Sequence, residues 1–178
     1  GTFQPNVTIS NVNANFGSTI EYVINGPSST RLVVGSNTDG NVHVYSHHNG
    51  TVTKTQTLKS SNVSSVTSLA VSTSNSWLYV GDSTNNVVEI YKLVGSSYVW
   101  ANIIHGPANS AFGTSLKYSL SNGLCVGAPM ADNVYANNGN VYVYNVSADT
   151  SYQLTQTITS NYKNQYALFG SSLSMDLY

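Results

Sequence analysis

Seven carboxylate side chains are the residues of this chain that could support acid–base or hydrolytic chemistry. Hydrolysis by a pair of carboxyl groups requires the two groups to lie roughly 5–9.5 Å apart. The acids are scattered along the sequence without any repeated pairing: Glu21, Asp39, Asp82, Glu89, Asp132, Asp149 and Asp176. A nucleophilic serine is not indicated either, because no Gly-x-Ser-x-Gly elbow occurs. The sequence therefore predicts a protein that is not an enzyme.

The histidines do not predict a metal centre. His43, His47 and His48 belong to one predicted hairpin, beside the turn at Asn49-Gly50. Adjacent residues of a strand point to opposite faces, and no cysteine or carboxylate is close to these histidines in the sequence. We therefore expect no metal here, and no motif of the chain predicts a cofactor.

The chain is poor in charge, which narrows the classes of partner that it could bind. Only 7% of its 178 residues are charged and the net charge is −1, against about 25% charged residues in ordinary domains. Binding to nucleic acid or insertion into a membrane is therefore not expected, since there is no basic patch and no apolar run of roughly 20 residues. The single cysteine, Cys125, allows no internal disulfide and is expected to be a buried apolar residue. This uncharged composition is typical of extracellular proteins, whether secreted, on a cell surface or on a virion.

A repeated pattern organises nearly the whole chain. Three strand patterns end in glycines that are 46 residues apart: Arg31–Gly35, Trp77–Gly81 and Gly123–Gly127. Each is followed by an alternating strand pattern, and further strand patterns precede and follow each pair. Every unit therefore predicts four short strands joined by turns, and no window shows helical periodicity.

Four strands in about 46 residues is the length of a β-propeller blade. We predict an all-β, propeller-like fold of three four-stranded blades with essentially no helix; a sandwich or a barrel is the alternative. The predicted repeats cover residues 16–61, 62–110 and 111–168 of a single domain. Residues 1–15 are expected to be the last strand of a preceding blade, and residues 169–178 the first strand of a following one.

The third repeat carries the most specific motif. It contains Phe112-Gly-Thr-Ser-Leu116, Leu124-Cys-Val-Gly-Ala-Pro129 and Gly139-Asn-Val-Tyr-Val-Tyr144. This pattern resembles the FG-GAP repeat of integrin-α-type β-propellers. The first repeat keeps Phe16-Gly17 and the second has only the strand pattern. The resemblance implies a propeller fold in which the phenylalanine and glycines serve packing and tight turns, and it implies no chemistry.

The calcium site of that family is not expected in this chain. Many FG-GAP repeats hold calcium in an acidic loop between their first two strands, because Ca²⁺ needs several anionic oxygen ligands. The corresponding segments here, 25–30, 72–76 and 119–122, contain no carboxylate. One aspartate per repeat lies instead in the loop after the second strand, where each is expected to cap a turn: Asp39, Asp82 and Asp132.

Three blades do not close a ring, since closed propellers have at least four. We therefore expect open ends that are completed by other copies through strand complementation, giving a dimer or a head-to-tail filament. The residues expected to pair between copies are Val7, Ile9, Phe169 and Leu173. The alternative is that the chain is a fragment of a larger closed propeller.

A second function is suggested by an insertion of seven residues in the third repeat, between Gly127 and Tyr144. An insertion in one loop of one repeat is often part of a functional face. Asp132, Asn133 and Tyr135 offer an acceptor, an amide and an aromatic ring, which suit a sugar or a partner loop. The alternative function is therefore a carbohydrate- or receptor-binding module, a lectin or adhesin.

Four sequons are candidates for N-glycosylation if the chain passes through a eukaryotic secretory route. Their asparagines are Asn6, Asn49, Asn62 and Asn145. Their number is close to what this composition gives by chance, so they are candidates by position alone.

Overall fold

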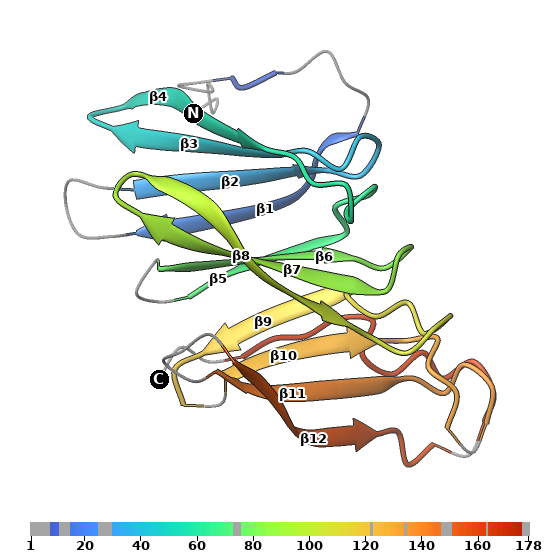
Figure 1. Cartoon of the computed structure of the whole chain (residues 1–178). Coiled ribbons are helices and arrows are strands. Elements are labelled where there is room, and N and C mark those ends of the chain that lie inside the picture. The colour runs from blue at the N-terminus through green and yellow to red at the C-terminus, as the bar shows by residue number, and fades with distance from the viewer. Residues whose placement is uncertain are drawn as a thin grey trace, which may run out of the picture.

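The computed structural model of the protein describes residues 8–10, 15–24, 30–72, 76–121, 123–133, 135–146, 151–162 and 164–175. These residues form twelve β-strands in three antiparallel four-stranded sheets, and they include no helix (Figure 1). The predicted all-β architecture is confirmed. None of the described residues belongs to a helix that could cross a membrane.

Each sheet holds four consecutive strands in sequence order, and we call each sheet a blade. Blade 1 consists of β1 (Phe16–Ile24), β2 (Thr30–Ser36), β3 (Val42–His48) and β4 (Thr51–Leu58). Blade 2 consists of β5 (Ser68–Val71), β6 (Trp77–Asp82), β7 (Val87–Val94) and β8 (Ser97–His105). Blade 3 consists of β9 (Ser115–Ser119), β10 (Gly123–Ala128), β11 (Asn140–Val146) and β12 (Tyr152–Thr159).

The blades share irregularities as well as strands. The ladder between the third and fourth strands is interrupted at the same place in all three, between Val44 and Tyr45, Ile90 and Tyr91, and Val143 and Tyr144. Such a bulge bends its strand and increases the twist of the sheet. The turn at Asn49-Gly50 has the positive φ angles, 48° and 77°, that these residue types tolerate. The repeat therefore extends to the details of strand pairing.

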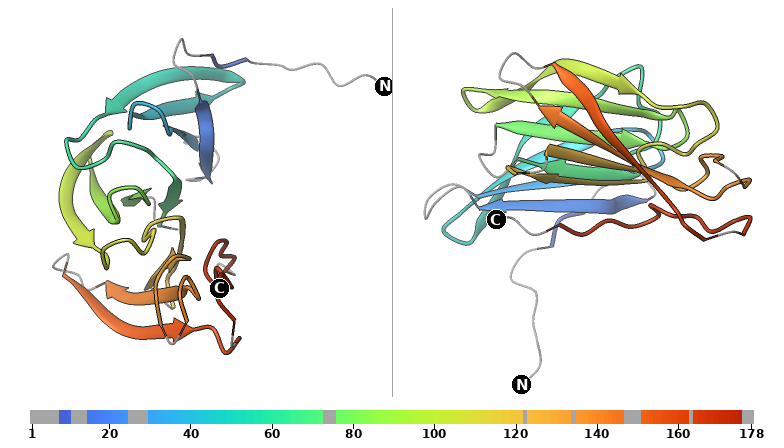
Figure 2. Two further views of the ribbon diagram at one scale, coloured as in Figure 1. Left: turned by 90° about the vertical axis from the view of Figure 1, so that its right-hand side faces the viewer. Right: turned by 90° about the horizontal axis from the view of Figure 1, so that it is seen from below.

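The three blades follow one another around an arc, with β1, β5 and β9 on its inner side (Figure 2). Residues alternate between the two faces of each sheet, so each blade contributes to the cores on both sides. We call the face that points toward the next blade in the sequence the forward face, and the opposite one the backward face. Val33 and Val44 on the forward face of blade 1 share a core with Leu69 and Val80 of blade 2.

The second core joins blades 2 and 3 in the same way. Tyr79 and Ile90 on the forward face of blade 2 pack with Leu124 and Val126 on the backward face of blade 3. Burial raises the pKa of the Tyr79 phenol far above its usual range, with Tyr152 and Tyr118 acting in the same direction. The cores between successive blades explain why the strands read as nearly continuous apolar runs.

Candidate functional site: the blade faces and their loops

The contact between successive blades is built on pairs of glycines, which we call glycine junctions. At the first, Gly113 of the Phe112-Gly113 turn lies against Gly81 of β6, and a Cβ atom on Gly81 would clash with the carbonyl oxygen of Gly113. Ser68 Oγ of β5 donates a hydrogen bond of 2.7 Å to that same oxygen. Two backbones approach closely here, which only glycine allows.

The same junction recurs at the end of blade 3. Gly170 lies against Gly127 of β10, and Ser115 Oγ of β9 donates a hydrogen bond of 2.7 Å to the Gly170 carbonyl. Phe169 contacts Gly139, the positive-φ residue that precedes β11. The segment after β12 therefore binds blade 3 as the start of a following blade would.

The junction between blades 1 and 2 departs from this pattern. Val66 stands where Phe-Gly has its glycine, and its side chain contacts Gly35 of β2. Ser18 Oγ of β1 lies within 3.2 Å of the Gly35 carbonyl, to which it donates, and 3.4 Å from the Val66 carbonyl. A valine side chain thus fills the space that the other junctions close with backbone.

Gly17 is the third Phe-Gly glycine, and it has no counterpart in the described part of the chain. Its φ of 86° matches the 93° of Gly113 and the 90° of Gly170. A Cβ atom built on Gly17 would meet no other atom within 4 Å. The turn is therefore formed in blade 1, but no preceding blade among the described residues packs against it.

The backward face of blade 1 is consequently one of two free blade faces. Ile20 and Tyr22 of β1 lie on it and are 57% and 51% exposed. Tyr22 Oη is 3.0 Å from Nδ1 of His47, and Phe16 packs edge-on against His43 with ring centroids 5.4 Å apart. The face is mostly aromatic over this area, and Lys54 of β4 is the charged residue beside it.

The other free face is the forward face of blade 3, which the segment after β12 covers in part, since Gly170 lies against Gly127 and Val141. Cys125 and Val143 are paired across β10 and β11 and occupy the register positions of Val33 and Val44 in blade 1. Ile158 of β12 is paired with Val141 on the same face and is 39% exposed. Cys125 is buried, and burial raises the pKa of its thiol. This agrees with the prediction that Cys125 is a buried apolar residue.

His43 makes the stability of blade 1 dependent on pH. Burial lowers the pKa of its imidazole below the usual 6.5, Lys54 acts in the same direction and Asp39 opposes it. As the pH falls, the imidazole of His43 is therefore protonated in the unfolded chain before it is protonated in the folded chain. The contribution of neutral His43 to the free energy of unfolding is complete above the pKa of the unfolded state and is lost as the pH falls below it. The free energy of unfolding should therefore fall between about pH 7 and pH 5, and this fall should be smaller in His43→Gln. A difference of one bound proton between the folded and unfolded states changes the free energy of unfolding by at most about 1.4 kcal/mol per pH unit.

Urea unfolding at the two pH values measures this effect. His48→Gln, at an exposed residue of the same strand, is the matched control and should keep the pH dependence of the original protein. Equal pH dependence in both variants would contradict the role assigned to His43.

The described residues at the two ends of the chain form no strand within this single copy, and their pairing between copies stays a prediction. Residues 8–10, which include Ile9, and residues 169–175, which include Phe169 and Leu173, form no strand; Val7 lies outside the described residues. Strand structure requires a hydrogen-bonded neighbour, and no described strand is paired with residues 169–175. Residues 168–171 instead form a turn, in which Ser171 N donates to Leu168 O.

The most connected carboxylate is Asp82, at the end of β6, where it is fully buried. Its Oδ2 accepts hydrogen bonds from Ser64 N, Ser64 Oγ and Ser65 N at 2.7, 3.1 and 3.1 Å, and from Asn85 Nδ2 at 3.0 Å. Its Oδ1 accepts from Thr84 N and Asn85 N at 2.8 and 3.1 Å. Asp82 therefore caps its own turn, as predicted, and also ties the segment between blades 1 and 2 to that turn.

Glu89 of β7 is the other fully buried carboxylate. Its Oε1 accepts hydrogen bonds from Ser60 Oγ and from Asn62 Nδ2, the latter at 2.9 Å, and its Oε2 accepts from Tyr91 Oη at 2.6 Å. Burial, followed by the contact with Glu89, raises the pKa of the Tyr91 phenol. These bonds hold the segment after β4 onto blade 2.

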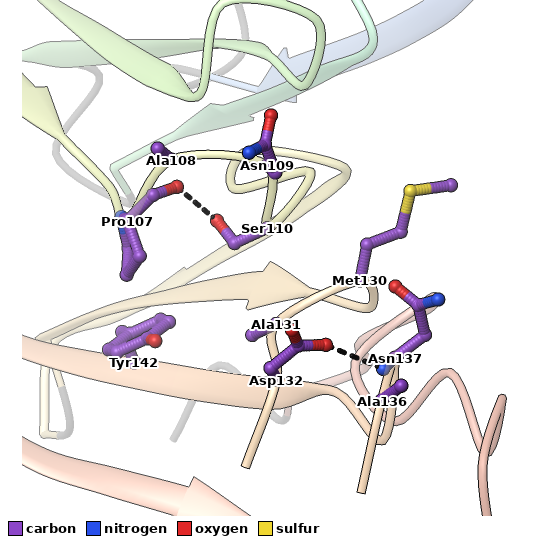
Figure 3. A pocket seen from close by; sticks show the side chains of 10 residues that line it. All are labelled: Pro107, Ala108, Asn109, Ser110, Met130, Ala131, Asp132, Ala136, Asn137 and Tyr142. Atoms are coloured by element: carbon purple, nitrogen blue, oxygen red, sulfur yellow. Dashed lines mark hydrogen bonds between the residues drawn. The ribbon is translucent and has the colours of Figure 1, made fainter.

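The inserted loop of the third repeat separates its predicted binding residues. Asp132 lines a pocket of about 420 Å³ between residues 107–110 and the β10–β11 loop (Figure 3). Its Oδ1 accepts a hydrogen bond of 2.8 Å from Asn137 N, so Asp132 caps its own loop, as predicted. Asn133 and Tyr135 line a second pocket of about 520 Å³ between this loop and the segment after β12. The structure therefore brings Asn133 and Tyr135 together and places Asp132 in the neighbouring pocket.

Neither a metal cluster nor a further ligand set is found among the described residues. The other capping aspartate, Asp39, accepts hydrogen bonds from Asn41 N and Nδ2 at 3.1 and 2.7 Å. Of the sequon asparagines, Asn49 and Asn145 are exposed, and the exposed Asn62 directs its amide nitrogen to Glu89. Asn6 lies outside the described residues.

Comparison with known proteins identifies the fold. No family model and no curated protein sequence matches the chain. Among solved structures, the chain is similar to a protein from Lactobacillus plantarum, with a TM-score of 0.62 and 15% identity over 82% of this chain and 42% of that one. A complex of KlAtg21 with the coiled coil of AgAtg16 gives a TM-score of 0.46 and 10% identity over 79% of this chain and 57% of that one. The chain therefore spans less than half of the Lactobacillus protein, and its fold is β-propeller-like.

Proposed function

We propose that this chain is a non-enzymatic assembly module, extracellular or on a virion surface, which self-associates by placing blade 1 of one copy on blade 3 of the next. The observation that carries the proposal is Gly17, a formed Phe-Gly turn with open space around it. The low charge of the chain is typical of the extracellular or virion-surface location that we propose. We also propose that the repeat of this chain is related to the FG-GAP repeat.

The chemistry of the two free faces supports this partner. Ile20 and Tyr22 on the backward face of blade 1 can pack with Ile158 and Val143 on the forward face of blade 3. Each face also carries a lysine, Lys54 beside Tyr45 on blade 1 and Lys117 beside Cys125 on blade 3. Inside the chain, equivalent positions form the two cores. The proposed contact between two chains therefore has the same form as the two contacts between successive blades within one chain.

The Gly127 contact is already occupied within each copy by Gly170. Docking of Gly17 from another copy at that site requires Phe169 and Gly170 to leave it. Association is therefore a competition between an intramolecular and an intermolecular Phe-Gly turn. In this proposal association proceeds through blade faces, and the strand complementation predicted from the sequence is the alternative route.

The geometry of closure sets the size of the assembly. Each copy offers one face of each kind, so the contact is heterologous and produces a ring if it closes and a filament if it does not. Two copies of three blades would make a ring of six, which is within the usual range of about four to eight.

Two glycine substitutions test the proposal with opposite expected effects. In Gly170→Asp, a Cβ atom 2.7 Å from the Asn140 carbonyl would drive the turn off blade 3 and free its contact site, so association should tighten about tenfold or more. In Gly17→Asp, the side chain blocks close approach of the backbone, so association should weaken. The double variant should stay at 19.0 kDa in sedimentation velocity runs.

Gly50→Asp is the matched control, because Gly50 also has a positive φ, 77°, and open space around it, but lies in the β3–β4 turn. It adds the same charge and should associate as the original chain does. If Gly170→Asp stays monomeric, or if Gly17→Asp and Gly50→Asp behave alike, self-association through this contact is wrong. The remaining candidate would then be a segment of a larger closed propeller.

A further inference from the structure

The second pocket, beside Tyr135, differs from the first in what surrounds it. It lies between the β10–β11 loop and the segment after β12, which run side by side at one end of blade 3 (Figure 1). Its volume is about 520 Å³, and its lining residues are Asn133, Tyr135, Asn138, Thr159, Ser160, Asn161 and Tyr162. We call it the tyrosine pocket.

None of the described residues that line the pocket is charged, which disfavours charged ligands. The pocket offers two phenol rings, three side-chain amides and two hydroxyl groups. Amides and hydroxyls both donate and accept hydrogen bonds, whereas a phosphate or carboxylate would find no cation among them. Tyr162 is 64% exposed and Tyr135 is half-buried, so at least one ring has a face free for apolar contact.

Asn138 supplies an independent sign of a ligand. Its side chain is 2% exposed and lines the pocket, and its Nδ2 donates a hydrogen bond of 2.8 Å to the Tyr162 carbonyl. Its Oδ1 has no hydrogen-bond partner. A buried acceptor without a donor is costly, and a hydroxyl group that enters the pocket can satisfy it after a small movement of the loop.

We propose that the tyrosine pocket binds a neutral saccharide of one or two residues. A sugar combines apolar C–H faces, which pack on tyrosine rings, with hydroxyl groups that pair with amides such as Asn133 and Asn138. An apolar ligand would leave the lining amides and hydroxyls unpaired. The pocket shares no lining residue with the glycine junctions, but it adjoins the last of them, because Phe169 N donates a hydrogen bond to Asn138 O.

Titration of the full chain with neutral and charged saccharides tests this inference. The probes are lactose, maltose, cellobiose and N,N′-diacetylchitobiose, with sialyllactose and a sulfated heparin disaccharide as charged comparisons. We expect saturable binding of at least one neutral probe in isothermal titration calorimetry, below a Kd of about 1 mM. In Tyr162→Ala, the affinity should fall about tenfold or more, because one of the two stacking rings is removed.

Tyr166→Ala is the matched control, because Tyr166 is 66% exposed on the same segment but does not line the pocket. It should bind as the original chain does, and melting temperatures show that each variant is folded. Three results would overturn the proposal: no binding of any neutral probe up to about 10 mM, tenfold above the expected Kd; binding of the charged probes alone; or equal loss of affinity in both variants.

Discussion

Asp82→Asn is expected to lower the free energy of unfolding by about 3 kcal/mol or more, although the two side chains have the same shape. All six hydrogen bonds to Asp82 come from donors. An asparagine side chain in that position replaces one carboxylate oxygen with an NH2 group that faces N–H or O–H donors, so at least two of these part-buried donors lose their acceptor. The affected donors belong to the β6–β7 turn and to Ser64 and Ser65, before β5.

Chemical denaturation monitored by tryptophan fluorescence measures this loss, since Trp77 lies at the start of β6. Asp39→Asn is the matched control: Asp39 is only half-buried, and it accepts hydrogen bonds from Asn41 of its own turn. It should cost about 1 kcal/mol or less. Equal costs for Asp82→Asn and Asp39→Asn would contradict the account of the segment between blades 1 and 2.

Gly81→Ala is the second large effect, and its cause is the glycine junction. A methyl group at this position clashes with the Gly113 carbonyl and with Ser68 Oγ. Backbone atoms of the Phe112-Gly113 turn cannot move aside cheaply, so blades 2 and 3 must separate slightly. We expect a loss of about 3 kcal/mol in the free energy of unfolding, the upper end of the range for overpacked cores.

Gly95→Ala separates this packing effect from backbone strain. Gly95 has a φ of 61° and no neighbouring atom within 4 Å, so alanine there costs about 1 kcal/mol for its left-handed conformation alone. Gly81 has no positive φ, so any larger loss at Gly81 measures the close approach of two blades. A loss at Gly81 that is no larger than at Gly95 would show that the junction tolerates a side chain.

The sequence predicted the blades because their pattern is local. Glycines 46 residues apart and alternating residues between them were sufficient to predict three sheets of four strands. The glycine junctions could not be predicted in the same way, because Gly81 meets Gly113 and Gly127 meets Gly170 across blades. The motif contained both glycines, but only the structure pairs them.

The end segments show the limit of the motif. Phe169-Gly-Ser-Ser-Leu173 has the sequence of a first strand, but strand formation depends on a neighbour that the described residues do not supply. The aspartates show a related limit: a turn cap was predictable at Asp82, whereas its donors at Ser64 and Ser65 come from a segment 17 and 18 residues earlier.

The seven-residue insertion predicted Asp132, Asn133 and Tyr135 as binding residues, and their role in binding stays a prediction. The structure places Asn133 and Tyr135 in the tyrosine pocket and Asp132 in the neighbouring pocket. The rest of the tyrosine pocket comes from β12 and the segment after it, including Tyr162, about 27 residues further along the chain. Nothing in the local sequence distinguished Tyr162 from the other tyrosines, of which the chain has 13 in all.

The mass of the purified chain in solution, measured by multi-angle light scattering from about 1 μM to 1 mM, tests self-association most directly. The original chain should show a mass that rises with concentration above 19.0 kDa, and Gly170→Asp should reach multiples of that mass at about tenfold lower concentration. Electron microscopy of the associated fraction should show closed rings or filaments. A mass of 19.0 kDa for both proteins at every concentration would contradict the account.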